Sequence, residues 1–198
     1  MRLLLLGPPG SGKGTQAERL AERFGIRHVS SGDLLRAEVE SGSSCGQAVS
    51  DALSKGELVP DDWVLDMLRE PILEASAEGG YLLDGFPRTL AQAEAAAEMA
   101  REEGVVADAA IFLRAEPDQL VQRLLDRAEE LGRSDDNEET IRHRIEVYNE
   151  KTAPLREYYA ERGILLEVDA LQSPDDVYRD IMTGLGRDAD PAAETTSA

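Results

Sequence analysis

Short apolar runs alternate with amphipathic segments along most of the chain. The runs that have the length of buried strands are residues 2–6, 26–29, 81–84, 105–113 and 164–168. Between these runs, apolar residues recur at helical spacing, as at Ala17, Leu20 and Phe24. The alternation predicts an α/β fold, in which helices flank a five-stranded parallel sheet and ligands bind at the carboxyl ends of the strands.

Caps, glycines and prolines predict the limits of the helices. We expect helices over residues 13–24, 34–39, 47–53, 63–77, 90–103, 117–130, 138–162 and 174–185. Gly46 is expected to precede the third helix as a break, and Pro71 is expected to kink the fourth. Residues 186–198 lack apolar periodicity and are expected to form a disordered tail after a single domain of residues 1–185.

The composition restricts the class of protein. A length of 198 residues suits one α/β domain, and no apolar run is long enough to cross a bilayer. The single cysteine, Cys45, cannot form an internal disulfide, and no residues have the spacing of a metal-ligand cluster. These features predict a cytoplasmic protein with no membrane partner.

The chain is strongly acidic, with 40 acidic residues against 21 basic ones and a net charge of −19. An excess of this size repels nucleic acid, which argues against DNA or RNA as a partner. Among the basic residues only Lys13, Lys55 and Lys151 are lysine. We interpret the acid surplus and scarce lysine as a halophilic-type surface, adapted to salt that screens self-repulsion. A simple solvated acidic surface is the alternative.

A glycine-rich loop directly follows the first apolar run. Residues 7–15 read GPPGSGKGT, and the order of strand, glycine loop and helix is what a phosphate-binding loop requires. The glycines let backbone N–H groups point at an anion, and Lys13 can reach the β- and γ-phosphates. Gly14 stands where the usual pattern has Ser or Thr, so Thr15 is the candidate hydroxyl for Mg²⁺. The alternative is a surface turn that happens to contain a lysine.

A second motif follows the third apolar run. Residues 84–89 read DGFPRT, with Gln92 three residues beyond. Asp84 lies where a carboxylate holds Mg²⁺ through water in phosphoryl-transfer sites. Arg88 offers a planar fork for a second phosphate, and Gln92 has the paired donor and acceptor that read a base edge. Taken alone, the string is also compatible with an ordinary turn.

Two further groups hold candidate polar residues. Ser31 and Arg36 lie at a predicted helix start, where the hydroxyl is also explained as an N-cap. The second group is formed by Arg123, Arg127, Arg133 and Arg144. Phosphoryl transfer requires cations around the charge on the transferring oxygens, and a mobile loop that bears arginine supplies them while it excludes water. Each arginine alone is equally compatible with a surface ion pair.

Together these motifs resemble the adenylate kinase family. The matching runs are GPPGSGKGTQ (7–16), HVSSGDLLR (28–36), GELVPD (56–61), DGFPRT with Gln92, and residues 122–144. The departure at Gly14 is that family's own form of the loop. The resemblance covers roughly residues 1–185. It implies a P-loop NTPase-type fold with an AMP-binding lobe at 30–59 and a short lid at 126–136, without structural zinc.

The resemblance also implies a reaction, the reversible Mg²⁺-dependent transfer of a phosphoryl group from ATP to AMP to give two ADP, by a monomer that serves adenine nucleotide homeostasis. ATP would be held by Gly10, Ser11, Gly12, Lys13, Gly14, Thr15, Arg123, Arg127 and Gln172. AMP would be held by Ser31, Arg36, Glu57, Leu58, Val59, Gly85, Phe86, Pro87, Arg88, Gln92, Arg133 and Arg144. The catalytic cations would be Lys13, Arg88, Arg123, Arg127, Arg133 and Arg144. Mg²⁺ would be held by Asp84 through water and by Thr15.

Two alternatives remain at this point. Uridylate and cytidylate kinases share the short lid, but they tend to carry Ala at the position of Ser31 and Asn at that of Thr89, so this sequence favours AMP. Ser31 also departs from the Thr usual in adenylate kinases, and it keeps the hydroxyl while losing a methyl group. A P-loop switch protein or hydrolase is the alternative from another class, but neither explains a second site with an arginine and a base reader.

Overall fold

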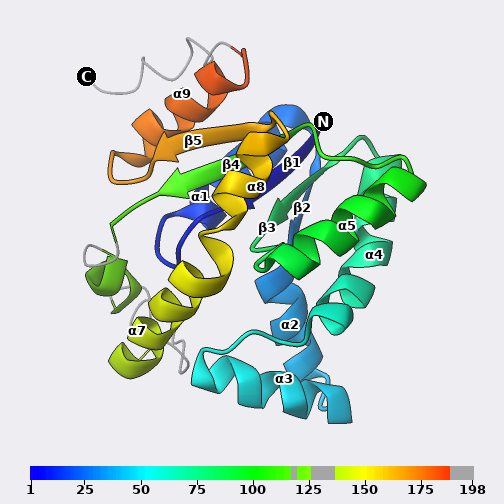
Figure 1. Cartoon of the computed structure of the whole chain (residues 1–198), viewed down its shortest axis with the longest axis vertical. Coiled ribbons are helices and arrows are strands. Elements are labelled where there is room, and N and C mark those ends of the chain that lie inside the picture. Colours follow the sequence, from blue (N-terminus) through cyan, green and yellow to red (C-terminus); the bar gives the residue numbers. More distant parts are fainter. Residues whose placement is uncertain (117–119, 126–136, 188–198) are drawn as a thin grey trace.

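The computed structural model describes residues 1–116, 120–125 and 137–187. Within these residues, five strands form one parallel sheet, as predicted, and their order is β2-β3-β1-β4-β5 (Figure 1). The strands are β1 (Arg2–Leu6), β2 (Arg27–Ser30), β3 (Tyr81–Asp84), β4 (Ala109–Arg114) and β5 (Leu165–Asp169). The chain builds the sheet first on one side of β1 and then on the other, so the loop that follows β1 lies at the topological switch point, where ligands bind in such folds.

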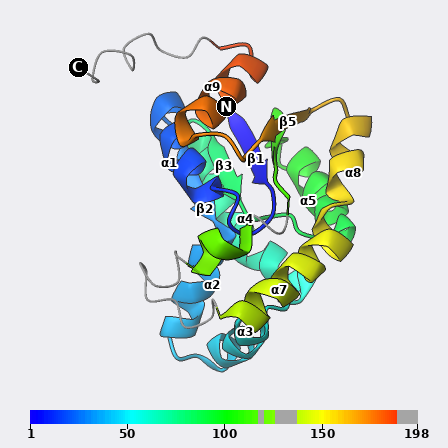
Figure 2. The same ribbon diagram turned by 90° about the vertical axis from the view of Figure 1, so that its left-hand side faces the viewer.

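Helices α1 (Lys13–Phe24) and α9 (Pro174–Gly184) cover one face of the sheet (Figure 2). Leu3 and Leu5 of β1 are fully buried there, in a core cluster with apolar residues of both helices. The α1 helix ends at Gly25, which adopts a left-handed conformation with φ 60°.

The opposite face is covered by α4 (Asp61–Ala77), α5 (Leu90–Glu102) and α8 (Leu155–Glu161). Leu4 and Leu6 of β1 pack there with apolar residues of all three helices. Because successive side chains of a strand point to opposite faces, a run of four leucines suits a central strand that is buried on both sides.

A lobe of two helices, α2 (Ser31–Glu40) and α3 (Ser44–Lys55), projects beyond the carboxyl edge of the sheet (Figure 1). Helix α7 (Glu138–Val147) approaches the lobe from the other side of the molecule. The two parts meet where the Thr140 hydroxyl donates to the Ser54 carbonyl at 3.5 Å. The lobe and α7 are therefore in contact with each other.

Helix α3 begins at Ser44 rather than at Gln47, because the Ser43 hydroxyl accepts the Gly46 N–H at 2.8 Å and caps the helix. The predicted break at Gly46 is therefore wrong. A Cβ at Gly46 would lie 2.3 Å from the Glu38 carbonyl oxygen, so glycine permits the close approach of α2 and α3.

The predicted single helix over residues 138–162 is also wrong. Helix α7 leads into a π-helical turn, η1 (Tyr148–Thr152), and α8 begins only after Pro154. Proline has no N–H for the helical ladder, and the wider π turn accommodates the missing bond. Pro71, in contrast, lies inside α4 without ending it.

Strand β4 starts four residues later than predicted. The Val105 N–H donates to the Ala100 carbonyl at 2.8 Å and so belongs to the end of α5. Pairing with β1 begins only where Ala109 meets Leu3. The predicted lid, and residues 188–198 of the predicted tail, lie outside the described residues. Within the described part, none of the helices combines the length and apolar character that spanning a bilayer would require.

Candidate active site

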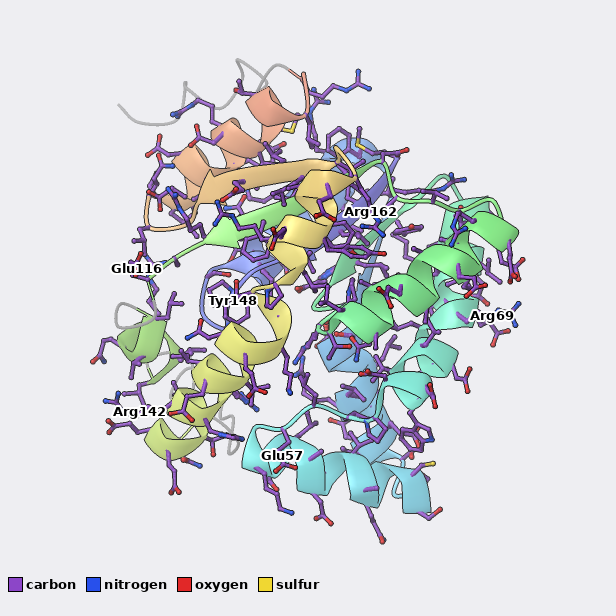
Figure 3. All side chains as sticks on the ribbon, in the orientation of Figure 1. Glu57, Arg69, Glu116, Arg142, Tyr148 and Arg162 are labelled. Atoms are coloured by element: carbon purple, nitrogen blue, oxygen red, sulfur yellow. The ribbon has the colours of Figure 1, made fainter. Side chains whose placement is uncertain are left out.

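A cleft of about 550 Å³ opens at the carboxyl ends of β1 and β3. Its walls are the loop after β1, the lobe, the loop after β3 and η1. Glu57 on the lobe side and Tyr148 at the start of η1 mark two of these walls (Figure 3). The predicted site residues that line the cleft are Gly10, Gly12, Lys13, Gly14, Thr15, Arg36, Glu57, Leu58, Asp84, Gly85, Pro87, Arg88, Arg123 and Arg144.

The loop after β1 is shaped to receive an anion. Lys13 Nζ donates to the Gly7 and Pro8 carbonyls, both at 2.9 Å, and so holds the start of the loop. Gly12, at φ 85°, precedes α1, whose first turn contains no acidic residue. The hydroxyl of Ser11 is buried without a hydrogen-bond partner. An open helix N-terminus beside an unsatisfied donor is suited to a phosphate group.

Asp84 ends β3 and lines the cleft beside this loop. Its Oδ2 lies 3.6 Å from Nε2 of His28, and this carboxylate raises the pKa of His28 against the opposing effect of burial. Asp84 and Thr15 both line the cleft, and carboxylate and hydroxyl oxygens are the ligand type that Mg²⁺ prefers. Among the described residues, no three His, Cys, Asp or Glu side chains form a metal site by themselves.

Arg88 lies in the loop after β3 and also lines the cleft, and hydrogen bonds fix both its side chain and its backbone carbonyl. Its Nε donates to the Gly85 carbonyl at 2.7 Å, and its own carbonyl accepts from the Thr152 hydroxyl at 2.8 Å. Burial lowers the pKa of this guanidinium, while the nearby Asp84 carboxylate raises it. Arg88 nevertheless stays charged, because arginine titrates far above neutral pH.

Three more predicted arginines lie at the same cleft. Arg36 lines it from α2, and Arg144 lines it from α7, where its Nη2 donates to the Leu53 carbonyl at 3.5 Å. Arg123 donates to the Ala170 carbonyl at 3.2 Å, on the loop that follows β5. In a chain with a net charge of −19, this convergence of guanidinium groups marks a site for an anion with many charged oxygens.

A smaller hollow adjoins the cleft beyond Arg88. The predicted residues that line it are Ser31, Glu57, Leu58, Val59, Gly85, Arg88 and Gln92. The buried Ser31 hydroxyl donates to the Gly85 carbonyl at 2.9 Å and so fixes the loop after β3. Leu35 and Val64 add apolar surface to the same hollow. Apolar walls beside one buried amide suit the flat faces and polar edge of a base.

Some predicted residues lie elsewhere. Phe86 is only 1% exposed, belongs to the core and lines neither hollow. Gln172 does not line the cleft, and its exposed side chain donates to Asp180 at 2.8 Å, so the predicted contact with the donor adenine involves the backbone near Gln172 and stays a prediction. Arg127 and Arg133 lie outside the described residues.

Two residues of the site were missed by the sequence analysis. Thr152 holds the Arg88 carbonyl, and Asp61 accepts from the Gln92 amide nitrogen at 2.7 Å. In the sequence, Asp61 ends the run GELVPD (56–61) with no role predicted for it, and Thr152 falls inside the helix predicted over residues 138–162. Each acts across more than 30 positions of sequence, so no local pattern could have identified its partner.

Comparisons with known proteins agree with this geometry. The sequence matches the family model described as Adenylate kinase over residues 5–164. An adenylate kinase of Thermus thermophilus is 48% identical over 184 residues, which cover 93% of this chain and 96% of that protein. The adenylate kinase of Kocuria rhizophila is 45% identical, and the alignment covers 94% of this chain and 99% of that protein. The adenylate kinase of Thermobifida fusca is 46% identical, with 93% of this chain and 98% of that protein covered. The chain therefore belongs to the adenylate kinase family.

Proposed function

We propose that this chain transfers a phosphoryl group reversibly from MgATP to AMP and so forms two molecules of ADP. The observation that carries the proposal is that two separate recognition sites open onto one cleft. The loop around Lys13 supplies one anion site, and Arg88 with the hollow behind it supplies the other. A hydrolase or a switch needs only the first site, whereas transfer between two nucleotides needs both.

On the donor side, the phosphates of ATP would occupy the loop from Gly10 to Thr15. Gly10, Gly12 and Lys13 line this space at the N-terminus of α1, where backbone N–H groups would bind the phosphates. The hydroxyl of Ser11, which is buried behind them without a partner, would gain an acceptor only if the loop shifted. The loop after β5, near Gln172, would contact the donor adenine through its backbone. Arg123 supports this side, because it bonds to the Ala170 carbonyl of the same loop.

On the acceptor side, Arg36 and Arg88 would bind the phosphate of AMP, and the hollow with Gln92 would bind its adenine. Residues 57–59, together with Ser31 and residues 85–87, would shape this pocket. The lobe of residues 30–59 would be the AMP-binding lobe, and residues 126–136 would be the lid.

Mg²⁺ would be held by Asp84 through water and by Thr15, whose oxygen atoms suit this cation. The ion would neutralise charge between the phosphates when ATP is bound. The chain's own residues then position the two substrates and surround the transferring group, with Lys13, Arg88, Arg123 and Arg144 as cations and Arg127 and Arg133 as their predicted partners. No side chain is required as a strong base.

The proposal also covers the oligomeric state, the cellular location and the partners of the protein. We expect a monomer that works in the cytoplasm with ATP, AMP and ADP as its partners, and the net charge of −19 argues against nucleic acid.

The proposal is tested by following ADP and inorganic phosphate from MgATP with and without AMP. We expect ADP formation that depends on AMP, with almost no phosphate release. Phosphate release at the same rate without AMP would establish a hydrolase instead, and slow turnover that AMP does not stimulate would favour a switch protein.

A further inference from the structure

Asp61, the first residue of α4, uses both oxygens of its carboxylate. Its Oδ1 accepts from Gln92 Nε2 at 2.7 Å, and its Oδ2 accepts from the Thr89 hydroxyl at 3.1 Å. That hydroxyl in turn accepts the Gln92 N–H at 3.0 Å. Asp61 therefore joins the start of α4 to the first turn of α5, and it bonds directly to the side chain that faces the base-sized hollow.

These contacts determine which way the Gln92 amide points. A carboxylate only accepts hydrogen bonds, so the atom beside Asp61 Oδ1 is the amide nitrogen. The Arg88 backbone N–H only donates, so the atom 2.7 Å from it is the amide oxygen. Turning the amide over would set oxygen against the carboxylate and NH₂ against the N–H. Gln92 is 3% exposed, so water could not relieve either mismatch.

The locked amide keeps one N–H and one oxygen lone pair for a ligand. On its Watson–Crick edge, adenine presents an amino donor beside a ring-nitrogen acceptor. Guanine presents a carbonyl acceptor beside an N–H donor on the same edge. An amide of fixed orientation matches one of these orders and opposes the other. An amide free to turn over would match both.

We propose that Asp61 is a positioning residue that sets the base selectivity of the acceptor site by locking the Gln92 amide. The inference rests on the proposed function, since it takes AMP as the acceptor. A purely structural role is the competing explanation, because a carboxylate in the first turn of a helix also stabilises the helix dipole. Asp62 lies in the same turn and is exposed, so it provides a matched control.

The experiment compares wild type with Asp61→Ala, Asp61→Asn, Asp62→Ala, Gln92→Ala and the double variant Asp61→Ala/Gln92→Ala. For each protein we would measure kcat and KM for AMP, for GMP and for ATP. In Asp61→Ala we expect KM for AMP to rise about tenfold or more, with the preference for AMP over GMP falling by a similar factor, because a buried amide loses its partner. The KM for ATP and the kcat at saturating AMP should change less than about twofold.

The other variants separate orientation from charge and from stability. Asp61→Asn should stay within about threefold of wild type for AMP, because its amide oxygen still accepts from Gln92 and its NH₂ can donate to Thr89. Asp62→Ala should match wild type. In the Gln92→Ala background, Asp61→Ala should have no further effect on KM for AMP, since Asp61 acts through Gln92.

If the wild type prefers AMP, three results would overturn the role proposed for Asp61 while leaving the proposed function intact. They are equal changes in KM for AMP and ATP in Asp61→Ala, a full effect of Asp61→Ala in the Gln92→Ala background, and a loss in Asp61→Asn as large as that in Gln92→Ala. The Asn variant keeps the test decisive if Asp61→Ala does not fold. A wild type that does not use AMP would overturn the proposed function, and this inference with it.

Discussion

At the scale of single residues, backbone carbonyls orient two cations of the cleft, Lys13 and Arg88, whereas Arg36 pairs with the Asp33 carboxylate. Lys13 donates to the Gly7 and Pro8 carbonyls, and Arg88 donates to the Gly85 carbonyl. A neutral carbonyl orients a cation without cancelling its charge. The anion-binding character of an acidic protein is thus concentrated at a few oriented side chains.

Arg88→Ala tests the acceptor assignment. We expect kcat/KM for AMP to fall about a hundredfold, because the variant loses a charge-assisted fork to the acceptor phosphate, with a much smaller change in KM for ATP. Steady-state ADP formation measures both. Arg69→Ala, an exposed arginine paired with Glu103, is the control and should match wild type. A rate for Arg88→Ala equal to wild type would show that the acceptor assignment is wrong.

Lys13→Ala tests the donor assignment. We expect kcat to fall by several orders of magnitude, because in the proposed site the lysine would face the donor phosphates, and its bonds to the Gly7 and Pro8 carbonyls hold the loop. Single-turnover rates measure the loss, and a thermal melt checks the fold. Lys55→Ala should leave the rate unchanged, since Lys55 is exposed at the end of α3. A mild effect of Lys13→Ala would remove this lysine from the mechanism.

Residues that act within a motif could be predicted from sequence, whereas residues that act across the fold could not. The motif DGFPRT with Gln92 predicts Asp84, Arg88 and Gln92 as site residues from their spacing alone. In the structure all three line the cleft or the hollow beside it. The roles of Asp61 and Thr152 depend on tertiary contacts to that motif. Sequence spacing carries no record of such contacts.

At the scale of elements, the site depends on how the lobe meets α7. Gly56 ends α3 with φ 75°, and an added Cβ would lie 3.0 Å from Arg144 Cγ and 3.2 Å from the Thr140 carbonyl oxygen. The same contact brings the Leu53 carbonyl to Arg144. The end of α3 therefore helps to set the position of a predicted catalytic arginine.

Gly56→Ala and Gly104→Ala separate backbone strain from this contact. Both glycines have φ near +70°, but a Cβ at Gly104 would meet nothing within 4 Å. We expect each variant to lose about 1–2 kcal/mol of unfolding free energy from the left-handed conformation, measured by urea denaturation. Only Gly56→Ala should also lower kcat/KM for AMP. Equal activities of the two variants would contradict a role for this contact in positioning Arg144.

Element boundaries were predicted where a local signal decides them. Gly25 and Gly56 end helices as expected, and both adopt the left-handed conformation. Gly46 misled the prediction because a glycine that ends a helix and a glycine that permits close packing look alike in sequence. The turn at η1 was not predicted because a proline alone does not reveal whether an α-helix continues through it, as at Pro71, or gives way to a π turn.

At the scale of the whole molecule, two charge distributions coexist. The chain carries a net charge of −19, while arginines from α2, α7 and the loop after β3 converge on one cleft. Self-repulsion of the acidic surplus destabilises the compact state in dilute buffer, and salt screens it. The net charge therefore affects the stability of the fold and its response to salt, whereas the arginines of the cleft serve the proposed function.

The salt hypothesis predicts that the melting temperature rises between dilute buffer and molar KCl, by about 2–4 °C for each kcal/mol of relieved repulsion. The control replaces the exposed Glu70, Glu78 and Glu98 with lysine. Each replacement removes one negative charge and adds one positive charge, so the net charge of −19 becomes −13. This variant should melt higher in dilute buffer and respond less to KCl. A wild-type melting temperature that does not rise with salt would contradict the hypothesis.

The most direct test of the central claim is ADP formation from MgATP with AMP, CMP, UMP and GMP each offered in turn. The two-site cleft with a base-reading Gln92 predicts strong preference for AMP over the other three acceptors. Preference for CMP or UMP would keep the fold and the chemistry but contradict the roles given to Ser31, Thr89 and Gln92. Phosphate release without any acceptor requirement would contradict the kinase assignment itself.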